Sequence, residues 1–143
     1  MANINQIVGL KQIIANLVRA TRSIEMGTEQ GLKLAGLRLQ KESQGLVPVD
    51  LGPLKASAYT RATGTGLRTV VYVGYTALYA LHVHELIGMT LKGQLRTVPP
   101  GQPGYRGRFW DPQGKAQAKF LEEPARRLIP TLRTIIKNKA RIP

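Results

Sequence analysis

The sequence predicts an α+β fold: a long N-terminal helix and a C-terminal helix packed on a small, mainly antiparallel sheet, with a long irregular loop. Apolar residues recur at helical spacing near both ends of the chain, and a run rich in β-branched and aromatic residues lies between them. With 143 residues the chain is expected to form a single domain, 1–143. Its expected parts are a long helix (1–46), a sheet region (47–85), an extended loop (86–114) and a C-terminal helix (115–140).

The first helix is predicted from an apolar stripe between residues 4 and 46. The stripe positions are mostly three, four or seven residues apart, which places them on one helix face: Ile7, Leu10, Ile14, Leu17, Ile24, Leu32, Ala35 and Leu39. Glycines at positions 27, 31 and 36 each cost up to about 1 kcal/mol relative to alanine within a helix. We therefore expect one long helix that bends or breaks near Gly27.

The sheet region begins where the prolines and glycine of "VPVDLGP" stop the helix. Residues 54–61 are expected to form one strand. "LRTVVYVGY" (67–75) is the strongest strand candidate because β-branched and aromatic residues dominate it. The glycine-rich "TGTG" (63–66) between the two runs indicates an antiparallel pair. The next stretch, "TALYALHVHEL", is compatible with either a short helix or a strand.

Residues 86–114 form the expected irregular loop, because six glycines and four prolines leave little room for regular structure. Loops of this length in small domains are usually functional or mobile. Helical spacing returns from Lys115 to Lys139, where Pro130 removes an internal hydrogen bond and is expected to kink the helix.

The composition narrows the classes of function. The net charge of +13 favours a polyanionic partner, which includes nucleic acid, a membrane surface or an acidic protein. The absence of cysteine excludes disulfides, zinc–thiolate sites and thiol catalysis. No apolar run approaches the roughly 18–20 residues that span a bilayer, so no membrane association through a spanning helix is expected.

The stretch "HVHE" is the strongest candidate for chemistry in the sequence. In a strand, His82 and His84 would point the same way, as two ligands of one metal do, whereas on a helix they would diverge. The interpretation that we favour is packing, with the ring nitrogens bonded to backbone or to Glu85. No Ser–His–Asp set or close carboxylate pair can be argued from spacing. We therefore expect no catalytic residues, no bound metal, no cofactor and no enzymatic activity.

Basic and aromatic residues gather within the predicted loop. Cations beside aromatic rings occur both at protein interfaces and on surfaces that follow a nucleic-acid backbone. The alternative is a solvated loop with its tryptophan packed into the core. The candidate subunit or DNA contacts are Lys92, Arg96, Tyr105, Arg106, Arg108, Phe109 and Trp110.

Three stretches together resemble phage neck and tail-completion proteins, the minor tail and head–tail joining components of long-tailed phages. "LVPVDLGPLKASAY" is similar to their P-V-D-T-G-x-L-R-x-S signature, with Leu51 and Lys55 in place of the usual Thr and Arg. "YALHVHE" resembles their Y-A-x-x-V-H-E, and "AKFLEEP" resembles the A-K-F-L-E-x-P that begins their last helix. The matching residues are Pro48, Asp50, Gly52, Ser57, Tyr79, Ala80, His84, Glu85, Lys119, Phe120, Leu121 and Glu122.

The resemblance implies a structural virion protein without a cofactor. It implies a homo-oligomeric ring, with six subunits expected, in the neck at the head–tail junction, made in the host cytoplasm. Its partners would be neighbouring neck, connector and tail proteins, with DNA in the channel as a candidate non-specific contact. The alternative function is that of a small basic DNA-binding protein. We also expect Tyr79, His82, His84 and Glu85 to hold the joint between the sheet and the following loop.

Overall fold

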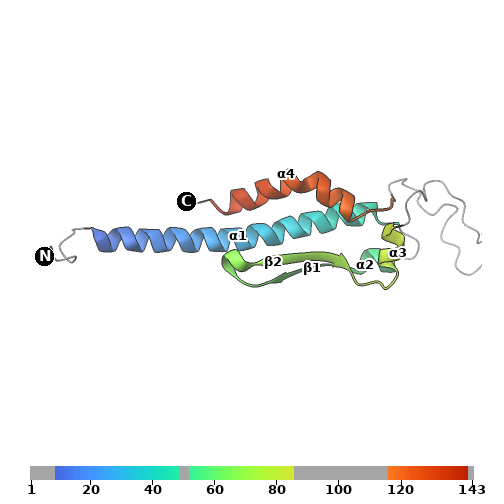
Figure 1. The fold of residues 1–143 in the computed structure, drawn as a ribbon, viewed down its shortest axis with the longest axis horizontal. Coiled ribbons are helices and arrows are strands. Elements are labelled where there is room, and N and C mark those ends of the chain that lie inside the picture. The colour runs from blue at the N-terminus through green and yellow to red at the C-terminus, as the bar shows by residue number, and fades with distance from the viewer. Residues whose placement is uncertain (1–8, 49–51, 86–115, 142–143) are drawn as a thin grey trace, which may run out of the picture.

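Helix α1 (Leu10–Leu46) is the axis of the molecule, and its N-terminal part projects beyond all the other described elements (Figure 1). The computed structural model describes residues 9–48, 52–85 and 116–141. After α1 come helix α2 (Pro53–Ala56), strand β1 (Ala58–Thr63), the 3₁₀ turn η2 (Gly66–Arg68), strand β2 (Val70–Tyr75), helix α3 (Ala80–Glu85) and helix α4 (Glu122–Lys139). The α+β class predicted from the sequence is confirmed.

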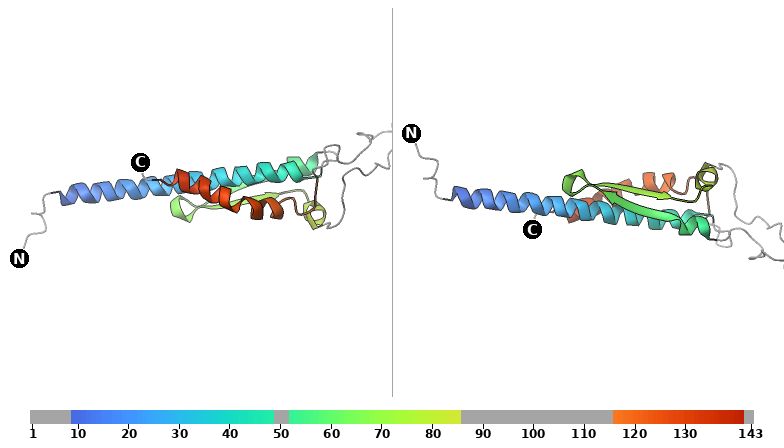
Figure 2. Two further views of the ribbon diagram at one scale, coloured as in Figure 1. Left: turned by 90° about the horizontal axis from the view of Figure 1, so that it is seen from above. Right: turned by 90° about the horizontal axis from the view of Figure 1, so that it is seen from below.

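The two remaining layers lie on different sides of α1. Helix α4 runs antiparallel to α1 on one side, and the β1–β2 hairpin lies on another, as the views from above and below show (Figure 2). The prediction from the sequence was that both long helices pack on the sheet. In the structure, α4 and the hairpin instead pack separately against α1. The expected loop, 86–114, and the first eight residues lie outside the described residues.

The predicted long helix is confirmed, and α1 is continuous through Gly27, so it does not break at this residue. The glycines of α1 are points of close approach. A Cβ on Gly27 would clash with the carbonyl of Lys139, and one on Gly31 would lie 2.8 Å from the Cα of Ile136. A Cβ on Gly36, on the other side of α1, would lie 2.6 Å from Val71. Packing against α4 and the hairpin therefore compensates the low helix propensity of these residues.

The hairpin pairs Ala58 with Tyr75 and Thr63 with Val70 in an antiparallel register. The expected strand over 54–61 begins later, at Ala58, because residues 53–56 form α2. Proline at the first position of a helix has its φ preset and needs no donor there, which explains why α2 starts at Pro53. The ambiguous stretch after β2 contains a short helix, α3.

Helix α4 begins at Glu122, later than the predicted start at Lys115. Lys119 has a positive φ of 55°, so the chain turns there, and Phe120 enters the core before the helix starts. The helix then continues through Pro130 to Lys139. None of the described helices is long and apolar enough to cross a membrane.

Candidate functional site: the junction of the three motifs

The three motif stretches meet at one end of the molecule, where α1 ends, α2 and α3 lie close together and α4 begins (Figure 1). The core cluster at this end contains Val47 and Leu54 from the first motif region, Ala80 from the second and Phe120 from the third. We call this region the motif junction. Of the motif residues predicted from the sequence, only Asp50 lies outside the described residues.

The side chain of Phe120 is the centre of the junction, with 1% of its surface exposed. Its ring makes edge-to-face contacts with two aromatic rings from different elements. The centroid distances are 5.1 Å to Tyr75 at the end of β2 and 5.0 Å to His84 in α3, each with an interplanar angle of 84°. Such pairs of aromatic rings stabilise a fold by about 0.5–1.5 kcal/mol beyond the gain from burying their surface. Phe120 therefore joins the hairpin, α3 and the start of α4.

The imidazole of His84 connects α3 to α4 through both of its nitrogens. Its Nδ1 lies 2.8 Å from Oε1 of Glu85, and the backbone N–H of Glu122 donates to its Nε2 at 3.4 Å. A nitrogen that accepts a hydrogen bond carries no proton, so these contacts place a ring proton on Nδ1, which donates to Glu85. Its nitrogens are therefore engaged within the junction, in the manner that the sequence interpretation favoured.

Lys119 forms the ionic part of the junction. Its Nζ lies 2.5 Å from Oε2 of Glu85 and 3.2 Å from Oε2 of Glu122. The hydrogen bond from Lys119 lowers the pKa of Glu85, and the same lysine lowers the pKa of Glu122. In return, the hydrogen bond to Glu85 raises the pKa of Lys119. The side chains of Lys119, Glu85 and Glu122 therefore stay charged at neutral pH, and their ion pairs connect α3 to the start of α4.

Backbone hydrogen bonds bring the two flanks of segment 86–115 together. The N–H of Lys119 donates to the carbonyl of His84 at 2.8 Å, and the N–H of Gln117 donates to the carbonyl of Leu46 at 3.1 Å. The chain thus leaves the described structure after Glu85 and re-enters it next to the same helix, α3. The expected contact residues Lys92, Arg96, Tyr105, Arg106, Arg108, Phe109 and Trp110 lie outside the described residues.

The outer face of the junction next to α3 is apolar and exposed. Leu78 is fully exposed, Leu81 is 72% exposed and Tyr79 is 48% exposed. His82 is also exposed, and because it lies two residues before His84 on a helix, the two side chains do not share a direction. No cluster of three metal-ligating side chains occurs among the described residues. The described part of this face is therefore mainly apolar and exposed.

The sequence interpretation missed two residues of the junction, Ser43 and Tyr75. The Ser43 hydroxyl is fully buried and lies 2.6 Å from the Tyr75 hydroxyl, and burial raises the pKa of that phenol. The signal was present: Ser43 continues the helical spacing of Ala35 and Leu39, and a polar residue on a buried face requires a partner.

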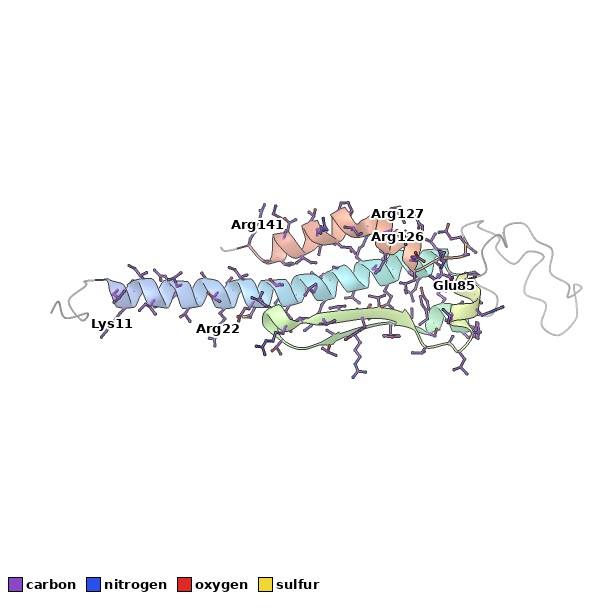
Figure 3. The ribbon with its side chains drawn as sticks, viewed as in Figure 1. Lys11, Arg22, Glu85, Arg126, Arg127 and Arg141 are labelled. Atoms are coloured by element: carbon purple, nitrogen blue, oxygen red, sulfur yellow. The ribbon has the colours of Figure 1, made fainter. Side chains whose placement is uncertain are left out.

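Charge is distributed unequally along the molecule (Figure 3). At the junction end, Glu85, Arg126 and Arg127 take part in ion pairs. Lys11 at the projecting end of α1 and Arg141 just after α4 have no acidic partner within the described parts of the chain, and the same holds for Arg133 and Lys137 on α4. The unpaired cations of the described residues therefore lie mainly along α1 and on the second half of α4, and Lys55 of α2 adds one at the junction.

Comparison of the chain with known protein families, with curated proteins and with solved structures finds no match.

Proposed function

We propose that this protein is a structural subunit of a phage neck, which forms a ring that joins the tail to the DNA-filled head. One observation carries the proposal: the three stretches that resemble neck and tail-completion proteins, separated along the chain, make one connected junction in the fold. The ion pair between Lys119 and Glu85 and the hydrogen bond from Glu122 to His84 join the stretches beyond the burial of apolar residues.

The distribution of surface side chains supports an assembly role. The motif junction presents exposed Leu78 and Leu81 beside the two flanks of segment 86–115. Single exposed apolar residues need no explanation, but two close together in sequence, Leu78 in the turn before α3 and Leu81 within it, favour a contact surface. In the proposed ring, this face meets a neighbouring subunit or the next ring of the neck.

The decisive experiment is interruption of the gene in the phage that encodes it, followed by negative-stain electron microscopy of the lysate. Separate filled heads and finished tails are the expected result, and a plasmid copy of the wild-type gene should restore joined particles. Joined particles in the absence of the gene would refute the proposal.

The same complementation tests whether the junction face makes the contact. Leu81→Asp places a charge on the face, while the matched control Ile129→Asp places one on α4, where the side chain is 45% exposed. Leu81→Asp should fail to restore joined particles and Ile129→Asp should restore them. Equal rescue by both variants would remove α3 from the contact surface.

A second candidate, binding to DNA, is favoured by the unpaired cations along α1 and on the second half of α4. A protein that neutralises several phosphates loses affinity steeply as salt rises, with a log–log slope of about −0.9 per phosphate contacted. Fluorescence anisotropy with a labelled duplex at several salt concentrations measures this slope. A tight complex with a steep slope, together with joined particles in the interrupted phage, would place DNA binding ahead of the neck role.

A further inference from the structure

We infer that the projecting part of α1 is a dimerisation surface, which pairs in antiparallel orientation with the same segment of a second copy of this chain. The inference is independent of the ring, because a two-fold contact closes on itself and does not generate one.

The projecting segment carries an apolar stripe without a cover. Every residue from Lys11 to Arg19 is exposed, and four large apolar side chains are 52–62% exposed. We call Leu10, Ile13, Ile14, Leu17, Val18 and Ile24 the N-terminal stripe. The other side of the same segment is polar, with Gln12, Asn16 and Arg19. A helix that is apolar on one face only is built to bury that face.

The N-terminal stripe is the direct continuation of the face that α1 buries against its own chain. Leu10, Leu17 and Ile24 are seven residues apart, and the next position in this series is Gly31, which lies against Ile136 of α4. Both covering layers stop at the same level. The last residues of α4 lie against Gly27, and the hairpin tip reaches α1 where Gly66 donates to Glu29. A partner helix on the stripe would continue the layer that α4 begins.

Two arguments favour an antiparallel pair: a parallel one would clash with α4 and the hairpin, and it would bring like charges together. In a parallel pair, the second α1 would run into the space that α4 and the hairpin already occupy from Gly27 onward. It would also place each Lys11 beside its own copy. An antiparallel pair puts the two covered parts at opposite ends, where they do not collide.

An antiparallel pairing centred on residues 18 and 19 also gives complementary contacts. Ile14 then lies beside Ile24 of the second copy, in a core layer typical of heptad packing. Lys11 lies beside Glu25 of the second copy, and by symmetry this ion pair forms twice. Neither Lys11 nor Glu25 has an ionic partner within the described parts of one chain. Thr21 fits the core because its hydroxyl already donates to the carbonyl of Leu17 at 3.0 Å.

The first test is the mass of the full-length protein in solution, by light scattering after gel filtration. We expect a particle of twice 15.7 kDa. The variant Ile14→Glu/Leu17→Glu places charges in the stripe and should raise the dissociation constant at least about a hundredfold. The matched control Gln12→Glu/Asn16→Glu adds the same charges to the polar side and should remain dimeric. All four positions are exposed in one chain, so circular dichroism should show that both variants fold.

The second test determines the orientation by cross-linking, which has no background because the chain contains no cysteine. Within one chain, positions 11 and 25 are about 21 Å apart along α1, too far for a disulfide. Oxidation of Lys11→Cys/Glu25→Cys should give an 11–25 link between two copies, identified by peptide mass spectrometry. Lys11→Cys alone should give no link.

Three results would overturn the inference: a wild-type monomer, links from 11 to 11 and from 25 to 25, or a larger assembly that Ile14→Glu/Leu17→Glu leaves intact. The last result would leave the proposed ring standing while removing the stripe from its contacts. Conversely, joined phage particles without the gene would refute the neck role and leave the dimer unaffected.

Discussion

Replacement of Gly31 by alanine tests whether glycine is required where α1 meets α4. In an open helix this change should stabilise the fold by up to about 1 kcal/mol, since alanine is the better helix former. Here the new Cβ would lie 2.8 Å from the Cα of Ile136 and 3.2 Å from its carbonyl oxygen. Both neighbours are backbone atoms, so α4 as a whole must move by about 0.6 Å to reach ordinary contact at 3.4 Å. Overpacking of this kind costs about 1–3 kcal/mol, so the expected net effect is a loss of about 1 kcal/mol.

The matched control is Gly45→Ala on the same helix, where no atom lies within 4 Å of the new Cβ. This variant should gain roughly 0.5–1 kcal/mol from helix propensity alone. Urea unfolding followed by circular dichroism at 222 nm gives both free energies of unfolding, provided that the transition is two-state. If Gly31→Ala stabilised the protein as much as Gly45→Ala, the close contact between α1 and α4 would be refuted.

Three further predictions concern the motif junction and the projecting helix. Phe120→Ala should lower the free energy of unfolding by about 3–5 kcal/mol, because the side chain is 1% exposed and its loss leaves a cavity; a loss under 1 kcal/mol in urea unfolding would contradict this. The pKa of Glu85 is lowered in the fold, so its contribution to stability is present above its ordinary pKa of 4.5 and is lost as pH falls through the folded value. Measured at a series of pH values, the free energy of unfolding of Lys119→Met should fall less on acidification than that of the wild type. The control Lys55→Met changes an exposed lysine that has no acidic partner among the described residues, and it should lose as much stability at low pH as the wild type. Hydrogen exchange should show the amides of residues 10–24 protected at high protein concentration and exposed on dilution, with the rest of α1 protected in both; protection of 10–24 that does not depend on concentration would contradict dimerisation.

The fold could be predicted from the sequence wherever one segment carried its own signal. The helical spacing up to Leu39, the β-branched run that became β2 and the turn before it each report local structure. Gly27 shows where local reasoning fails. Its conformational cost suggested a break, but the contact with Lys139 that makes glycine necessary comes from a residue far away along the chain.

The motif junction was predictable in its parts and not in its assembly. The resemblance named His84, Lys119 and Phe120, and the sequence indicated that the histidine would bond locally. No spacing rule could show that Phe120 lies between His84 and Tyr75, or that Ser43 contacts Tyr75, because these contacts join elements brought together by tertiary packing. The start of α4 was misplaced for the same reason, since the turn at Lys119 is held by its bond to α3.

The size of the residues on one face of α1 differs between the part that packs within the chain and the part that we propose pairs with a second copy. Where α1 packs against its own chain, the face is built from small residues, Gly27, Gly31 and Ala35, which let α4 approach closely. Toward the N-terminus the same face changes to large apolar residues such as Leu17 and Ile24. Small residues let a neighbouring helix approach closely, whereas large apolar residues gain the most free energy when they are removed from water. The change occurs at the level where α4 and the hairpin end, which is why we place the boundary between the folded body and its dimerisation surface at residues 25–27.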